Sequence, residues 1–227
     1  MADAHSIEQS PVARSPIAPA PPEVVVDGWA VSGRRSGAAL TLTDSTPLAK
    51  IAVKAAVDGA TADSLGVAFG RSAREDWGLG PGGDVLIVGS GPGEWLVLAP
   101  PAQGTAVTER LQEAATRTGE LVTVIDVTHG RALVRLTGER APDLLAKECG
   151  VDLGDEMFPD GAALRSAVSR VATDIIRDDR GALNGSRSYL LHCERSSGQY
   201  LFDSLLDAGG EFEVEVDGFM PPDVPPE

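Results

Sequence analysis

Runs of apolar residues, broken by turn-forming residues, divide most of the chain into short strands and helices. The segments DVLIVGS and EWLVLAP are joined by Gly-Pro-Gly, a spacing that predicts a β-hairpin. Apolar residues at helical spacing follow, so we expect a helix capped by Thr105 and ended by Gly119. The pattern here is two strands and then a helix.

The same plan of two strands and a helix recurs along the chain. A second unit joins LVTVIDV and ALVRLTG to the helix RAPDLLAKECG, and a third joins AVSRVATDIIR and SYLLHCE to SSGQYLFDSLLDAGG. Ser196 or Ser197 is expected to cap the last helix. An earlier unit, AALTLTD with LAKIAVKAAV and ATADSLGVAFG, follows the plan less clearly, and EFEVEV alternates as an edge strand does. These units predict an α+β fold with largely antiparallel sheets.

Proline-rich segments lie at both ends of the chain. Residues 1–23 are predicted to form an extended arm, either disordered or laid along another surface, because proline cannot donate the hydrogen bonds of a helix or sheet. Residues 217–227 form an acidic, proline-rich tail, which leaves a folded body at 24–216. No stretch has the apolar character of a secretory signal or a membrane span, so no contact with a membrane is expected.

Composition narrows the class of protein. Aromatic residues make up only 4% of the chain, so the core must rest on aliphatic side chains. The 34 acidic and 19 basic residues give a net charge of -15, which would repel nucleic acid. The two cysteines form no C-x-x-C pair, which indicates a reducing compartment. We therefore expect a soluble cytoplasmic protein.

No complete catalytic constellation is evident in the sequence. The glycine-rich GSGPGEW is followed by a strand, whereas a phosphate-binding loop must open a helix. His192 and Cys193 are neighbours on a predicted strand and must point to opposite faces, with His192 expected on the solvent side and Cys193 in the core. We expect no catalytic residue, no cofactor site and no metal site on this chain.

The segment LVTVIDVTHGRALVR allows two interpretations. Asp126 stands near the end of an apolar strand, with His129 and Arg131 close behind it. The carboxylate could brace the turn THGR by accepting its backbone N–H groups, with Arg131 as an ion-pair partner. Strand ends beside a cleft also carry ligand-binding groups, so the three residues could instead form part of a site.

Several segments together resemble a known family. DVTHGRALVRLTGERAPDLLAKECGVDL is similar to the aspartate–Ser/Thr–His/Arg, strand and helix pattern of the aminomethyltransferase-like folate-binding superfamily. Within it the chain most resembles the gamma subunits of heterotetrameric sarcosine oxidase. The further segments that agree, in the family's order, are ARSPIA, GPGEWLVLAP, CGVDL followed by MFPDG, and SSGQYLFDSLLDAG. The resemblance covers residues 12–210, most clearly 81–210.

The resemblance implies a non-catalytic subunit that packs against the folate-binding region of the alpha subunit. The family's enzyme converts sarcosine, tetrahydrofolate and oxygen into glycine, methylenetetrahydrofolate and hydrogen peroxide. Its alpha, beta and delta subunits would hold FAD, FMN, NAD, zinc and tetrahydrofolate, and this chain none of them. Asp126, His129 and Arg131 would then be the remnant of a folate site.

Three residues are candidates for contact with partner subunits: Pro16 in the arm, Trp77 in the loop REDWGLGPGG, and Trp95. For Trp95 packing in the core is the favoured alternative, since it lies within an apolar strand. The alternative function is a stand-alone folate-binding or aminomethyltransferase-like protein. The lack of a second ligand cluster and of an extra C-terminal domain weighs against that alternative.

Overall fold

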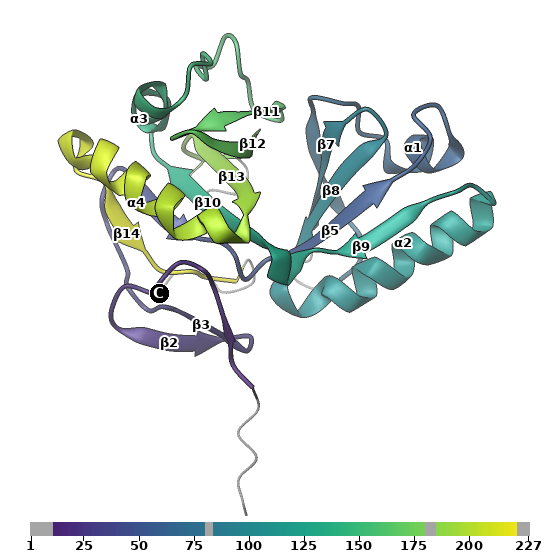
Figure 1. Cartoon of the computed structure of the whole chain (residues 1–227), viewed down its shortest axis with the longest axis horizontal. Helices are drawn as coiled ribbons and strands as arrows, with labels where there is room; N and C mark the ends of the chain where they lie inside the picture. The colour runs from purple at the N-terminus through teal and green to yellow at the C-terminus, as the bar shows by residue number, and fades with distance from the viewer. Residues whose placement is uncertain (1–10, 80–83, 180–184, 222–227) are drawn as a thin grey trace, which may run out of the picture.

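The computed structural model describes residues 11–79, 84–179 and 185–221. Two β-sheets pack face to face, and helices cover their outer faces, so the body is built of four layers (Figure 1). A third, small sheet lies at one end. The expected parts of the arm and tail at 1–10 and 222–227, including His5, lie outside the described residues.

The first large sheet has six strands in the order β11-β12-β13-β10-β4-β14. Its strands are β4 (Thr41–Asp44), β10 (Arg131–Thr137), β11 (Ala163–Val168), β12 (Val171–Arg177), β13 (Ser188–Glu194) and β14 (Glu215–Asp217). Only the pairing of β14 with β4 is parallel within this sheet. The segment EFEVEV therefore does supply an edge strand, but only its last two residues, Glu215 and Val216, belong to that strand.

The second large sheet has five antiparallel strands in the order β6-β7-β8-β5-β9. Its strands are β5 (Ala49–Lys54), β6 (Ser72–Asp76), β7 (Asp84–Gly91), β8 (Glu94–Ala99) and β9 (Thr123–Asp126). The predicted hairpin of β7 and β8 is confirmed. The prediction that LVTVIDV pairs with ALVRLTG is wrong, because β9 pairs with β5 while β10 belongs to the other sheet.

The third predicted strand pair also differs in detail. AVSRVATDIIR is not one strand but parts of β11 and β12, joined by a two-residue turn. Ser169 and Arg170 both have positive φ, 50° and 67°, which matches the twist of a tight hairpin. Neither residue is a glycine, asparagine or aspartate, so the usual sequence signal for this turn is missing.

In the described part of the chain, four α-helices accompany the strands: α1 (Ala60–Leu65), α2 (Gly104–Thr118), α3 (Ala141–Glu148) and α4 (Gly198–Ala208). The expected stop at Gly119 is confirmed by its left-handed φ of 68°. The expected cap by Thr105 is wrong, because a 3-10 turn at Pro101–Gln103 leads directly into α2. No helix of the described residues has the length and apolar character needed to cross a bilayer.

Separate apolar clusters fill the spaces between the layers. One lies between the six-stranded sheet and helices α3 and α4, and a second lies between the five-stranded sheet and α1 and α2. A third joins the sheets to each other through Leu86, Val88, Leu96, Leu98, Leu133, Ala163, Ile176 and Leu190. Each central strand is thus apolar on both faces, which explains the continuous apolar runs of the sequence.

The arm and the start of the tail pack against the body. The small sheet consists of β1 (Ala13–Arg14), β2 (Glu23–Val26) and β3 (Trp29–Ser32). Ile17 is only 1% exposed in the main core, and Phe219 is buried against Trp29 and Val31. The predicted boundaries at 23 and 216 therefore do not separate independent packing units in the described residues.

Candidate functional site

The turn after β9 is braced by the carboxylate of Asp126. Its Oδ1 accepts the backbone N–H of Thr128 at 2.8 Å, and Asp126 is exposed. The turn-bracing interpretation of Asp126 is therefore confirmed. The expected ion pair of Asp126 with Arg131 is wrong, because Arg131 faces Glu194 across the β10–β13 ladder and pairs with it.

A buried lysine lies beneath this turn and was not singled out from the sequence. Lys50 is 0% exposed, and its Nζ donates to the carbonyl oxygens of Thr46 at 2.6 Å, Leu48 at 2.7 Å and Thr128 at 3.4 Å. Burial lowers the pKa of Lys50 to about 7, although the charges of Asp44 and Asp126 oppose that shift. The sequence signal was a lysine inside the apolar strand LAKIAVKAAV.

His129 makes a different kind of contact from those of Asp126 and Arg131. Its ring stacks on Trp29 of the small sheet, with centroids 4.9 Å apart and an interplanar angle of 13°. Asp126 thus braces the turn, His129 holds the small sheet, and Arg131 pairs with β13. The three residues do not converge on a common point.

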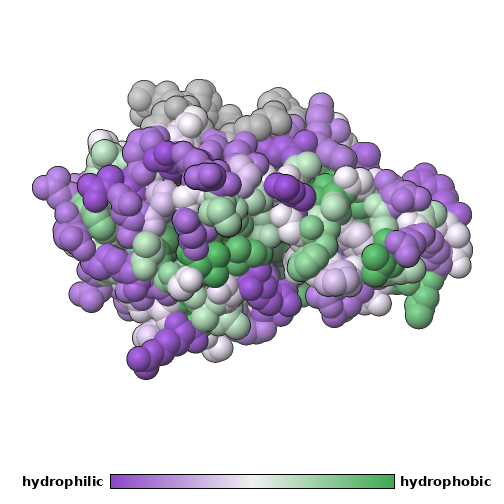
Figure 2. Space-filling model, turned by 90° about the horizontal axis from the view of Figure 1, so that it is seen from above, coloured by the Kyte–Doolittle hydropathy of each residue, from purple (hydrophilic) through white to green (hydrophobic). Residues whose placement is uncertain are grey.

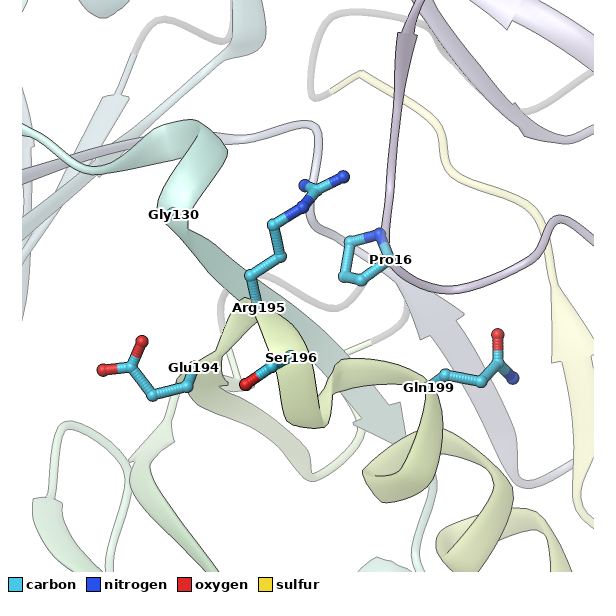
Figure 3. A pocket seen from close by; sticks show the side chains of 6 residues that line it. All are labelled: Pro16, Gly130, Glu194, Arg195, Ser196 and Gln199. Atoms are coloured by element: carbon cyan, nitrogen blue, oxygen red, sulfur yellow. The ribbon is translucent and has the colours of Figure 1, made fainter.

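Beside the turn lies a depression of about 510 Å³ where the arm crosses the body (Figure 3). It is lined by Pro16, Gly130, Glu194, Arg195, Ser196 and Gln199. The Arg195 side chain extends between the turn at Gly130 and the arm at Pro16. There it donates to the carbonyl oxygen of Arg14 at 2.8 Å and to that of His129 at 3.4 Å.

Few of the side chains that line the depression could take part in a reaction. No imidazole or thiol lines it, and its one carboxylate, Glu194, points away from Pro16 and pairs with Arg131 (Figure 3). Among residues 11–79, 84–179 and 185–221, no three His, Cys, Asp or Glu side chains gather as a metal site would need. The arrangement is suited to holding chain segments together.

The three partner-contact candidates occupy different environments. Trp95 is 6% exposed in the core and donates its indole N–H to the carbonyl of Val67 at 2.7 Å, so its assignment as a partner contact is corrected to core packing. Trp77 is half-buried, with the guanidinium of Arg110 4.6 Å from its ring centroid. Pro16 is also half-buried at the rim of the depression.

Charged side chains bridge the two large sheets near β6 and β12. Asp178, at the end of β12, accepts hydrogen bonds from Arg74 of β6 at 2.6 and 2.7 Å and from Arg135 of β10 at 2.9 Å. Burial raises the pKa of Asp178, but the two guanidinium groups outweigh it and hold that pKa at about 2. This cluster joins three segments that the sequence separates widely.

His192 lies between the sheets and not on the solvent side, which corrects the sequence-based prediction. It is 6% exposed, and its Nδ1 lies 2.9 Å from Oδ2 of Asp174 on β12. The prediction assumed that one face of β13 is exposed to solvent, whereas the five-stranded sheet covers that face. Cys193 points to the opposite face and is buried in the core, as predicted.

Comparison with solved structures defines the class of fold. The chain superimposes on a chain of the heterotetrameric sarcosine oxidase from Corynebacterium sp. U-96, in complex with pyrrole 2-carboxylate, with a TM-score of 0.64 and 23% identity, covering 80% of this chain and 89% of that one. The glycine cleavage system aminomethyltransferase T from Bartonella henselae gives a TM-score of 0.65 and 19% identity over 86% of this chain and 55% of that one. The fold is therefore the aminomethyltransferase-like fold.

Sequence comparison then shows the family. The model of the sarcosine oxidase, gamma subunit family matches residues 49–211, and the chain belongs to this family. A curated relative, sarcosine oxidase subunit gamma from Arthrobacter sp., is 31% identical over 112 residues. That match spans 49% of this chain and about half, 52%, of the relative.

Proposed function

We propose that the chain is the gamma subunit of a heterotetrameric sarcosine oxidase and that it contributes to assembly, not to the chemical step. The observation that carries this proposal is the family match over residues 49–211, which includes the whole five-stranded sheet, strands β10 to β13 of the six-stranded sheet and helices α1–α4. The internal contacts of Asp126, His129 and Arg131 support a non-catalytic role, since each side chain is engaged within the chain.

The reaction and partners belong to the same proposal. The assembled enzyme would convert sarcosine, tetrahydrofolate and oxygen into glycine, methylenetetrahydrofolate and hydrogen peroxide. The alpha, beta and delta subunits would carry FAD, FMN, NAD, zinc and tetrahydrofolate, and this chain would pack against the folate-binding region of alpha. A cytoplasmic location is consistent with the two buried cysteines, Cys149 and Cys193, being free thiols.

We place partner contacts at Trp77 and Pro16, which both keep part of their surface exposed. Trp77 is the stronger candidate, because tryptophan is enriched among residues that dominate interface energetics. The depression beside Pro16 could admit a partner side chain without disturbing the core. Trp95 is not part of this proposal.

Co-expression with the three partner chains tests the function. We expect the chain to co-purify stoichiometrically with them and the complex to release hydrogen peroxide when sarcosine is added. Trp77→Ala should weaken the co-purification, whereas Trp77→Phe, which keeps an aromatic ring for Arg110, should largely preserve it. A chain that stays a monodisperse monomer among these partners and binds tetrahydrofolate tightly by calorimetry would instead be a stand-alone folate-binding protein.

A further inference from the structure

Strand β9 forms a free edge of the five-stranded sheet. It pairs with β5 on one side, and among the described residues no strand lies on its other side (Figure 1). The N–H of Val127 donates to the carbonyl oxygen of Lys50 at 2.8 Å, which shows which backbone groups face β5. Because backbone groups of an antiparallel strand alternate in direction, those of Val124 and Asp126 point outward. In the described part of the chain no backbone hydrogen bond satisfies these outward groups.

A row of unpaired backbone donors and acceptors is suited to one kind of ligand, which is another extended backbone. In β-strand addition the main-chain hydrogen bonds supply affinity and the side chains supply specificity. Proteins usually protect a free edge with proline, lysine or a β-bulge. The sequence of β9, TVID, contains neither proline nor lysine, and its register with β5 is regular. The edge is therefore open to a further strand.

Exposed apolar side chains gather around this edge. Leu121 is 95% exposed, Val57 58% and Ile125 51%. The segments of Leu121 and Val57 are adjacent, because the Glu120 carboxylate accepts the N–H of Ala60 at 2.6 Å. Figure 2 shows hydrophobic residues among hydrophilic ones at the right-hand end of the molecule, which is the end of the α2–β9 connection in Figure 1. Exposed apolar patches of this kind mark interaction surfaces.

The apolar surface continues from the edge onto the face of the sheet. Ile125 is the cross-strand neighbour of Ala52, which lines a cleft of about 400 Å³ between the two large sheets. The six-stranded sheet buries Leu96, the next residue of the same row, but leaves Ala52 half-buried. A strand added to β9 would therefore cover side chains on this face as well as the backbone edge.

Carboxylates at both ends of the edge favour a basic partner. Asp58 follows Val57, and Asp126 ends β9; both are exposed, and neither forms an ion pair in the described residues. Lys54 on the neighbouring strand is already paired with Glu94 at 2.6 Å. A second copy of this chain would bring the same carboxylates to the edge, and each copy carries a net charge of -15, so self-pairing is disfavoured.

We propose that β9 accepts an extended segment of a partner protein as a sixth strand of its sheet, and that basic residues flank apolar ones in this segment. The backbone of the segment pairs with Val124 and Asp126. Its apolar side chains cover Leu121 and Ile125, and its basic residues lie beside Asp58 and Asp126. The surface does not depend on which enzyme the chain belongs to, so this inference and the assembly role proposed above can fail separately.

Calorimetric titration of the full 227-residue chain with a synthetic strand tests the ligand class. The probe is acetyl-KVTVTVK-amide. One comparator, acetyl-EVTVTVE-amide, reverses the flanking charges, and the other is the probe N-methylated at every valine and threonine, which removes those backbone donors. We expect saturable binding of the probe and binding about tenfold or more weaker for either comparator. No saturable binding of the probe up to about 1 mM, or equal binding of a comparator, would overturn the proposal.

Hydrogen exchange and variants locate the site. The bound probe should slow exchange of the amides of Val124 and Asp126. Ile125→Lys places a charge on the apolar edge through an exposed side chain and should abolish binding. Val25→Lys is the matched control, because Val25 is 59% exposed on β2, an edge strand of the small sheet, and this variant should bind the probe like the parent.

Three outcomes of these measurements would contradict the proposal. Ile125→Lys could bind the probe like the parent, or Val25→Lys could lose binding in its place, and either result would locate the ligand elsewhere. Dimerisation of the parent chain that Ile125→Lys abolishes, measured by sedimentation, would assign the edge to a second copy. Urea unfolding of both variants shows that a loss of binding is not a loss of fold.

Discussion

Charged residues around the turn at 126–131 are satisfied by groups of the chain itself. Asp126 accepts one backbone N–H, and Lys50 donates to three carbonyl oxygens. Desolvation costs the lysine more free energy than the aspartate, because Lys50 is fully buried whereas Asp126 is exposed. A polar residue within an apolar run can therefore serve to hydrogen-bond backbone groups, and it need not belong to an active site.

Replacing Asp126 distinguishes these roles. Asp126→Ala removes the acceptor for the Thr128 N–H, and we expect a loss of about 1 kcal/mol in the free energy of unfolding, measured with urea. Asp126→Asn retains an oxygen acceptor and should stay within about 0.5 kcal/mol of the parent. If Asp126→Asn unfolds like the parent while the assembled enzyme loses activity, Asp126 has a functional role after all.

Among the elements, helix α4 and the arm depend on each other. A Cβ at Gly198 would lie 2.6 Å from Cβ of Ala132 and 2.9 Å from Cγ of Pro16. Only glycine allows the start of α4 to approach both β10 and the arm so closely. Gln199 adds a hydrogen bond, since its Oε1 accepts the N–H of Ala18 at 2.7 Å. The described part of the arm thus packs against the chain's own body.

Gly198→Ala should loosen this junction. We expect a loss of about 1–3 kcal/mol in unfolding free energy from overpacking, together with faster tryptic cleavage after Arg14. Gly210→Ala is the matched control, because a Cβ there would meet no atom within 4 Å. Equal cleavage rates in the two variants would show that the arm does not depend on this contact.

For the whole molecule, the packing of the two large sheets is the central feature. Apolar side chains fill the middle of their interface, and the Arg74–Asp178–Arg135 cluster lies beyond them. At the other side the sheets leave the cleft lined by His192 and Asp174. Removing one member of the cluster would leave a charge buried without a partner, which is costly.

Asp178→Asn should therefore destabilise the whole chain. Two guanidinium groups would lose their buried counter-ion, and we expect a loss of about 3–5 kcal/mol in unfolding free energy at pH 7, with Asp207→Asn on exposed α4 surface as the unchanged control. The pKa of Asp178 is about 2 in the folded chain and 3.8 in an unperturbed carboxyl group.

The sign of the pH dependence follows from this depressed pKa. The stabilisation by ionised Asp178 is present above pH 3.8 and is lost as the pH falls toward 2. The parent should lose part of its advantage over Asp178→Asn across that interval in urea titrations at several pH values. A difference in stability that stays constant with pH would contradict the assignment of the ionised carboxylate.

Local patterns in the sequence were sufficient for the features that depend on near neighbours. The β7–β8 hairpin and the end of α2 at Gly119 were predicted, and turn bracing was one of the two interpretations given for Asp126. Each depends on interactions within a few residues, where backbone geometry and side-chain type decide the outcome. The family resemblance added the fold class, which the structural comparison confirmed.

Only the tertiary structure decided which strands pair and what lies between the sheets. β9 and β10 are consecutive in sequence but join different sheets. No local sequence pattern distinguishes two such strands from the two strands of a hairpin. His192 is buried because another sheet covers its face, and Asp178 meets Arg74 across 104 positions of the chain. The sequence determined the elements and the class of protein, because these depend on short-range propensities and shared motifs. The tertiary structure decided the contacts, because burial and ion pairing depend on residues that the chain brings together only when it folds.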